Sequence, residues 1–204
     1  GRMPVGGFYF DAIIRQPPIV EEELDPADNL EEFGPLGQED LQHISAEVQR
    51  VADSPRARVG SFGGTGLGDI ALVPAPFLEH PRGIRDVAEW YISTVTRPEY
   101  IHRVFAAQTE MALENLERLQ PLVGDAIDVL FICGTDFGTQ QSTFCSPDTF
   151  DTLYAPYYRR INDWVHANTG WKTFKHSCGA VEPFMRRFVD CGFDIINPVQ
   201  CSAA

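Results

Sequence analysis

The stretch Ala126-Ile-Asp-Val-Leu-Phe-Ile-Cys133, followed by Gly134-Thr-Asp-Phe-Gly-Thr-Gln140, decides the fold of this 204-residue chain. Its first eight residues are almost continuously apolar, which is typical of a strand buried on both faces of a parallel sheet. The glycine-containing polar run that follows predicts the end of the strand and a loop. Parallel strands are joined by crossover connections, so the rest of the chain is expected to alternate strands with helices.

The flanking sequence has this alternation. Apolar residues at helical spacing, with capping residues before them, predict helices, and short apolar runs bounded by glycine or proline predict strands. We expect helices at about 39–52, 83–120, 146–165 and 181–191, and strands at about 58–62, 126–133, 171–175 and 193–196. Pro156 should kink or restart the third helix.

The alternation of strand and helix favours an α/β fold, either a (β/α)8 TIM barrel or a doubly wound sheet. No dinucleotide fingerprint follows any predicted strand, and no Lys-Ser/Thr follows the glycine run 63–68, which we interpret as a flexible loop. The barrel is therefore preferred. A complete barrel needs about 250 residues and eight strands, so this barrel is expected to be incomplete. We treat 1–204 as a single domain with an irregular, proline-rich rim segment at 1–37.

Composition excludes several classes of partner. The formal net charge is −13, and only Lys172 and Lys175 are lysines, so no basic stripe is available for nucleic acid. No apolar run reaches the roughly 18 residues that span a bilayer, and the start has no signal-peptide pattern. We therefore expect no membrane and place the protein in the cytoplasm. The five cysteines lack CxxC spacing and fit reduced thiols better than a disulfide framework.

The segment Phe174-Lys-His-Ser-Cys-Gly179 carries the most specific chemistry. At the end of a strand, side chains two positions apart point to the same side, so His176 and Cys178 should face one space. An imidazole nitrogen and a sulfur are both ligands that Zn²⁺ prefers. The alternative is a buried, hydrogen-bonded histidine beside an inert thiol. Chance alone gives a His-x-Cys in about one such chain in eight, so context has to decide.

That context is the carboxyl ends of the predicted strands, where barrel enzymes build their sites. Asp136 is our candidate catalytic residue, with a general base, a partner orienting His176 or a loop cap as open alternatives. Cys201 is a candidate third metal ligand. The candidate substrate-binding residues follow two of the strands and are Gln140, Asn197 and Gln200.

Together, these motifs resemble a known family. From about residue 58 onward, the chain is similar to the uroporphyrinogen decarboxylase superfamily, and more narrowly to its branch that includes zinc- and corrinoid-dependent methyltransferases. The resemblance is carried, in this order and spacing, by Asp136-Phe-Gly-Thr-Gln140, Ser146-Pro147, His176-Ser-Cys178-Gly179 and Asp194-Ile-Ile-Asn-Pro-Val-Gln200.

The resemblance implies a TIM barrel and a zinc site that uses His176 and Cys178. In the methyltransferase branch a further ligand comes from a segment that follows the position equivalent to Ala204. True uroporphyrinogen decarboxylases use no metal and bind substrate carboxylates with an arginine-rich segment near their start. In this chain Arg15-Gln16 is followed by Pro17-Pro18 instead, which argues against decarboxylation.

We therefore expect zinc-dependent methyl transfer that involves a corrinoid (methylcobamide), carried by a partner protein, and a small thiol or methylated substrate. A homodimer is compatible with the sequence. One alternative is a metal-free decarboxylase that acts on an acidic tetrapyrrole. The non-enzymatic alternative is a metal-binding or partner-binding remnant.

Overall fold

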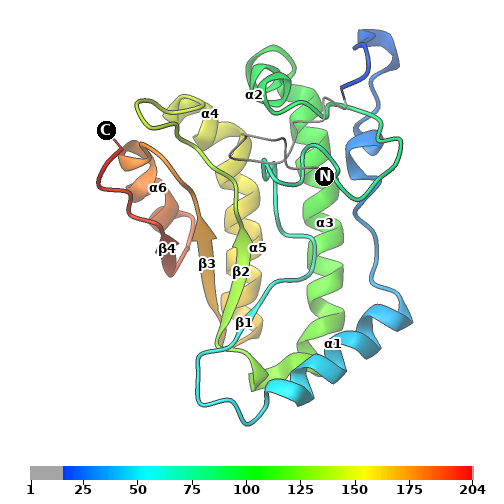
Figure 1. The fold of residues 1–204 in the computed structure, drawn as a ribbon, viewed down its shortest axis with the longest axis vertical. Coiled ribbons are helices and arrows are strands. Elements are labelled where there is room, and N and C mark those ends of the chain that lie inside the picture. The colour runs from blue at the N-terminus through cyan, green and yellow to red at the C-terminus, as the bar shows by residue number, and fades with distance from the viewer. Residues whose placement is uncertain (1–15, 204) are drawn as a thin grey trace, which may run out of the picture.

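The structure of the chain is a computed structural model that describes residues 16–203 (Figure 1). Its strands are β1 (Val59–Gly60), β2 (Val129–Cys133), β3 (Lys172–His176) and β4 (Ile195–Asn197). Its α-helices are α1 (Gln38–Val51), α2 (Val87–Thr96), α3 (Pro98–Val123), α4 (Pro147–Thr149), α5 (Ala155–Asn168) and α6 (Met185–Asp190). Short 3-10 helices are η1 (Glu21–Glu23), η2 (Pro26–Leu30), η3 (Gly124–Ala126) and η5 (Glu182–Phe184). None of the helices in this part of the chain combines the length and apolar character needed to span a bilayer.

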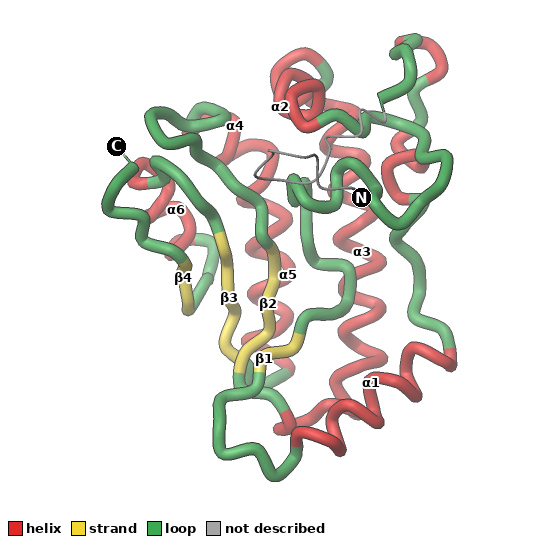
Figure 2. Tube along the Cα trace, in the orientation of Figure 1, coloured by secondary structure: helices red, strands yellow, loops and turns green. Residues whose placement is uncertain are grey.

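The four strands form one sheet in the order β1-β2-β3-β4, and every pair is parallel. Figure 2 shows the strands side by side, with α5 running along the sheet and α3 beside it. Each strand follows the previous one through a connection that contains helix, as parallel pairing requires. The predicted α/β alternation is confirmed, and the arrangement is that of consecutive units in part of a TIM barrel.

The two faces of β2 differ in burial. Leu130 and Ile132 are buried among the helices, whereas Val129 and Phe131 on the opposite face are half-buried. Phe131 packs against Phe174 of β3, with ring centroids 5.4 Å apart. The sequence predicted that both faces of β2 are buried, but burial is complete only on the face toward the helices. The four strands do not close into a barrel, so the opposite face is only partly covered.

The end of β2 departs from regular pairing. The register with β3 shifts between Phe131 and Cys133, so that Cys133 pairs with Lys175. Both Ile132 and Cys133 are consequently buried, which breaks the strict alternation of the strand. Such bulges re-aim side chains and are common next to functional sites.

The single helical tract expected at 83–120 was wrong, because the structure has two helices there. Arg97, at φ −134° and ψ 48°, separates α2 from α3. Proline excludes the preceding residue from the helical region but is well suited to the first helical position, so Pro98 ends one helix and begins the next. The predicted apolar stripe of α3 is confirmed as core and consists of Ile101, Phe105, Ala112, Leu116 and Leu119.

The helix expected after Ser146 begins as predicted but is interrupted. The Ser146 Oγ accepts a hydrogen bond from the Thr149 N–H at 3.0 Å, and Pro147 occupies the first position. A π-helical segment, η4 (Phe150–Tyr154), then precedes α5, which restarts at Ala155 with Pro156 in its first turn. The restart at Pro156 confirms the expected effect of this proline.

The rim segment expected at 1–37 is irregular in the part that the structure describes. Residues 16–37 contain only η1 and η2 as helical turns. The acidic run Glu21–Glu23 is exposed, and Glu21 pairs with Arg97. Arg15 and the residues before it lie outside the described residues.

Candidate metal centre

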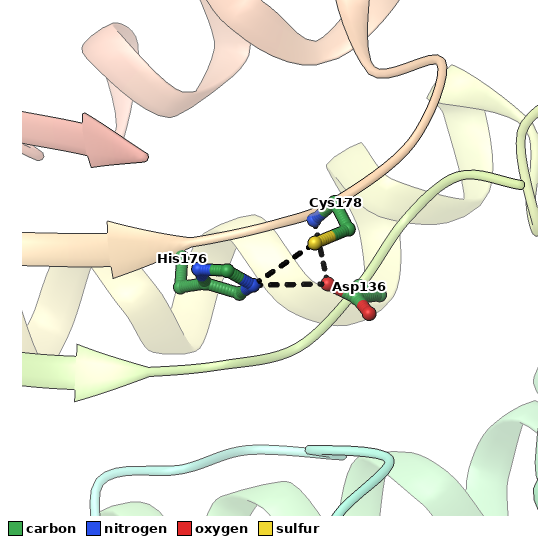
Figure 3. Close-up of side chains that lie close together, drawn as sticks. All are labelled: Asp136, His176 and Cys178. Atoms are coloured by element: carbon green, nitrogen blue, oxygen red, sulfur yellow. Dashed lines mark hydrogen bonds and ion pairs between the residues drawn. The ribbon is translucent and has the colours of Figure 1, made fainter. Parts of the chain in front are cut away.

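Side chains from two neighbouring strand ends converge at the carboxyl edge of the sheet (Figure 3). Asp136 follows β2, His176 is the last residue of β3, and Cys178 comes two positions later. Asp136 Oδ1, His176 Nε2 and Cys178 Sγ all lie within 4.8 Å of one another. Nε2 is 3.2 Å from Sγ and 3.8 Å from Oδ1. The expectation that His176 and Cys178 face one space is confirmed, and Asp136 joins them there.

The local backbone explains this convergence. Ser177, between the two ligand-type residues, turns to the other side and is fully buried, where its Oγ accepts the Phe137 N–H at 3.0 Å. The Ser177 N–H donates to the Asn197 carbonyl at 2.9 Å and so extends the pairing of β3 with β4. The Cys178 N–H donates to Asp136 Oδ1 at 2.6 Å, which fixes the carboxylate against the thiol.

Asn197 orients the imidazole. Its Oδ1 lies 3.0 Å from His176 Nδ1, so the histidine can donate its Nδ1–H to the amide oxygen. Nε2 is then unprotonated and faces the carboxylate and the sulfur, as a metal ligand requires. About a third of the His176 side chain is exposed, so the cluster is open to solvent.

Two glycines bring the loops after β2 and β3 into backbone contact. Gly179 has φ +90°, and a Cβ there would lie 2.1 Å from the Gly138 carbonyl oxygen. A Cβ on Gly138 would lie 2.7 Å from the Ala180 nitrogen. The Ala180 N–H donates to the Thr139 carbonyl at 2.8 Å. The two loops are thus held at a spacing that leaves no room for a side chain.

Gln140 and Gln200 lie on the rim of the cluster and contact each other. Gln200 Oε1 accepts the Gly179 N–H at 2.9 Å, and its Nε2 donates to Gln140 Oε1 at 2.8 Å. These contacts brace the loops around Cys178. Their expected role in substrate binding stays a prediction.

Cys201 does not join the cluster. It is exposed, and its Sγ donates to the nearby Val199 carbonyl. Within residues 16–203, the third donor beside His176 and Cys178 is Asp136. The suggestion of Cys201 as third ligand was wrong because the chain turns after β4 and carries this side chain to the surface.

The electrostatics of the cluster keep the thiol protonated when no cation is present. Burial and the neighbouring Asp136 carboxylate raise the pKa of the Cys178 thiol. Within the described residues, no lysine or arginine forms an ion pair with Asp136. A cation placed among the three donors would therefore meet a carboxylate that no lysine or arginine neutralises and a thiol that must release its proton.

Two further residues at this edge escaped the sequence analysis. The Tyr91 hydroxyl, from α2, donates to the Asp136 carbonyl, and its ring stacks on Phe144 at 4.7 Å. Asp69 is buried, accepts the Gly134 N–H at 2.9 Å and lines a cavity of about 220 Å³ beside β2. Asp69 follows β1, so applying the strand-end rule to that strand would have found it. Tyr91 has no signal of this kind, since it arrives from a distant helix.

Comparison with known proteins agrees with this geometry. The chain belongs to the uroporphyrinogen decarboxylase (URO-D) family, whose profile matches residues 10–200. The resemblance seen in the sequence is thereby confirmed, and with it the α/β fold as part of a TIM barrel.

Among solved structures, a methyltransferase from Methanosarcina mazei is similar, with a TM-score of 0.50 and 15% identity. The match covers 81% of this chain and 45% of that one, so the chain spans less than half the length of that structure. This likeness establishes the fold. A search of curated proteins found no match.

Proposed function

We propose that this protein takes part in zinc-dependent methyl transfer between a corrinoid carried by a partner protein and a small thiol or methylated substrate. The observation that carries the proposal is the convergence of Asp136, His176 and Cys178 at the carboxyl edge of the sheet. The similarity to a methyltransferase and the sequence resemblance to the zinc- and corrinoid-dependent branch of the family support the choice of reaction.

The donor set fits zinc. Tetrahedral zinc with bonds of about 2.0 to 2.3 Å separates its donor atoms by about 3.3 to 3.6 Å. In the cluster the nitrogen lies 3.2 Å from the sulfur and 3.8 Å from the oxygen, and all three donor atoms lie within 4.8 Å of one another, so small shifts of the side chains would bring them to tetrahedral spacing around one ion. The sulfur donor disfavours Mg²⁺ and Ca²⁺, which prefer oxygen ligands. Three protein donors with an open position are the composition of a catalytic rather than a structural zinc site.

Bound zinc would act as a Lewis acid that stabilises a thiol as thiolate or the leaving group of a methylated substrate, and the corrinoid would supply the methyl–cobalt chemistry. The residues of this chain have three tasks. His176, held by Asn197, presents Nε2 to the ion. Cys178 gives up its proton on binding, so zinc affinity should rise with pH. Asp136 contributes the oxygen donor and fixes the Cys178 backbone.

We also propose that Gln140, Asn197 and Gln200 bind the substrate. Gln140 and Asn197 are exposed, Gln200 is half-buried, and all three lie on the rim around the donor cluster. Amide side chains can donate or accept, which suits a small polar substrate.

The experiment measures zinc content and methyl transfer together. Purified protein should hold about one zinc per chain and should demethylate methylcobalamin in the presence of a small thiol, followed by the visible spectrum of the corrinoid. Cys178→Ala should lose both properties. Cys201→Ala, which removes an exposed cysteine outside the cluster, should keep both. Zinc binding that survives Cys178→Ala, or a chain that binds no zinc at all, contradicts the proposal.

The family match favours one alternative function, that of a metal-free decarboxylase acting on an acidic tetrapyrrole. Such a substrate would need arginine clamps for its carboxylates. Arginines on the helices instead pair with acids, as Arg160 of α5 does with Glu110 and Arg187 of α6 with Asp151. Tight binding of a porphyrinogen by the zinc-free protein would support this alternative function.

A further inference from the structure

Lys175 is a buried lysine that the proposed chemistry does not use. It precedes His176 in β3 but points to the opposite side, toward the helices, and its side chain is fully buried. Its Nζ donates to the Thr135 carbonyl at 3.1 Å and contacts Cys133 Sγ at 3.2 Å. A weaker contact of 3.5 Å reaches the His176 carbonyl. Within residues 16–203, no carboxylate forms an ion pair with this nitrogen.

Aromatic rings surround the Lys175 Nζ in place of a counter-ion. The four ring centroids lie 4.8 to 5.8 Å away and belong to Phe137, Tyr158, Phe188 and Phe193. The negative faces of such rings attract an ammonium group, most strongly where water is excluded. Burying a charge without a carboxylate is otherwise costly, so the position of Lys175 calls for a reason beyond packing.

The reason lies in where the sheet ends. The pairing between β2 and β3 runs no further than Cys133 and Lys175, after the register shift. Thr135, whose carbonyl accepts from Nζ, comes directly before Asp136. Lys175 comes directly before His176. The side chain therefore continues the connection between the two strands where their backbone pairing stops, beside both donor-bearing residues.

We infer that Lys175 is a positioning residue that sets the spacing between Asp136 and His176, and thereby the metal affinity of the cluster. This inference rests on the proposed zinc function for its readout. If Lys175 had a role in stability alone, its replacement would leave the zinc affinity of the folded protein unchanged. Replacing a buried charge by an apolar group of similar size is often neutral or stabilising for the fold, so a loss of zinc affinity would point to positioning.

The test compares Lys175→Met with Thr173→Val. Thr173 is also fully buried on the helix-facing side of β3, but its hydroxyl contacts Gly192 and Asp194 at the other end of the strand. Zinc affinity is measured by chelator competition on folded protein, and the amide exchange of Cys178 is followed by NMR in the zinc-free protein. Lys175→Met should lower zinc affinity on the order of tenfold and speed exchange of the Cys178 N–H. Thr173→Val should change neither.

The outcomes separate this inference from the proposed function. If the wild-type protein binds no zinc but Lys175→Met still speeds exchange at Cys178, zinc chemistry is overturned and the positioning role stands. If Lys175→Met leaves zinc affinity and exchange unchanged, or Thr173→Val alters them equally, the positioning role is overturned. Should Lys175→Met fail to fold, Lys175→Gln, a neutral side chain with one amide group, takes its place with the same expected changes.

Discussion

The two edges of the same parallel sheet carry polar residues of opposite character. At the amino edge, a charged residue precedes β1, β2 and β4 and begins β3, and the signs alternate across the sheet as Arg58, Asp128, Lys172 and Asp194. Arg58 pairs with Asp128, and Lys172 with Asp194, both at 3.3 Å. At the carboxyl edge, Asp136, His176 and Cys178 converge, and within the described residues no lysine or arginine forms an ion pair with Asp136.

The pKa shifts follow this division. Although partial burial acts to raise it, hydrogen bonds from the Thr173 N–H, His166 and Lys172 lower the pKa of Asp194 to about 2. At the other edge, burial and Asp136 raise the pKa of the Cys178 thiol. One edge is arranged so that its charges stabilise the fold, and the other keeps donors available for a ligand, as is usual at the carboxyl end of barrel strands.

The largest effect on zinc affinity should appear when a histidine at the carboxyl edge is replaced by alanine and compared with the same replacement at the amino edge. His176→Ala should lower zinc affinity by about 100-fold or more, because it removes a ligand. His166→Ala removes the 2.9 Å contact with Asp194 and should leave zinc affinity unchanged. Chelator competition measures both. Equal losses of zinc affinity in the two variants would remove the distinction between the edges.

Next in size is the effect of an acid-to-amide change on stability. Asp194→Asn should lower the free energy of unfolding by about 1 to 2 kcal/mol at pH 7, because it weakens hydrogen bonds to a charged group. The ionised carboxylate stabilises the fold above its ordinary pKa of 3.8, and this contribution is lost as the pH falls toward 2.

The difference between the wild-type protein and Asp194→Asn should therefore shrink as the pH is lowered from about 5 to about 3, as measured by urea unfolding. Asp136→Asn is the matched change at the carboxyl edge. The Asp136 carboxylate accepts the Cys178 N–H, a contact that an amide oxygen can keep, so the free energy of unfolding of the zinc-free protein should fall by about 1 kcal/mol or less and by less than in Asp194→Asn. A larger loss from Asp136→Asn than from Asp194→Asn would reverse the comparison.

A smaller effect on the metal is expected at Asn197. Asn197→Ala removes the partner of His176 Nδ1 and should lower zinc affinity about tenfold, as loss of a group that orients a ligand does. Isothermal titration with zinc provides the measurement. An unchanged affinity would mean that the imidazole needs no orientation from β4.

The smallest effect should come from Gln140→Ala. Gln140 is exposed and contacts Gln200 rather than a donor atom, so zinc affinity should stay within about twofold of the wild-type value. If Gln140 binds the substrate, the KM of methyl transfer should rise while zinc content stays constant. This result would show that Gln140 on the rim acts on the substrate and not on the metal, although the rim and the metal cluster both lie at the carboxyl edge of the sheet.

Much of this arrangement could be predicted from the sequence because it depends on local patterns. The apolar run before Gly134 and the alternation of strands with helices predicted parallel strands, and the spacing of two at a strand end predicted that His176 lies beside Cys178. Prolines were partly informative. Pro156 was interpreted correctly, whereas Pro98 was overlooked inside an otherwise continuous helical pattern.

What could not be predicted depends on contacts between distant segments. The carboxylate of Asp136 was recognised, but its choice among three roles depends on a 2.6 Å hydrogen bond from the Cys178 backbone, which no local pattern encodes. Tyr91 reaches the site from α2, forty-five residues before Asp136. The register shift between Phe131 and Cys133 places Cys133, one residue further along, opposite Lys175. The hydrophobic pattern of the sequence does not reveal a shift of a single residue.

The contact between Gly138 and Gly179 has a consequence for which substitutions this chain tolerates. Even a methyl group at either position would collide with the backbone of the opposite loop, and the positive φ of Gly179 is unfavourable for any other residue. In a saturation library screened for folded protein, both positions should accept glycine alone. Each of the two glycines is thus required by the backbone of the opposite loop. A protein with an insertion in one loop should fold only if the other loop carries a compensating change.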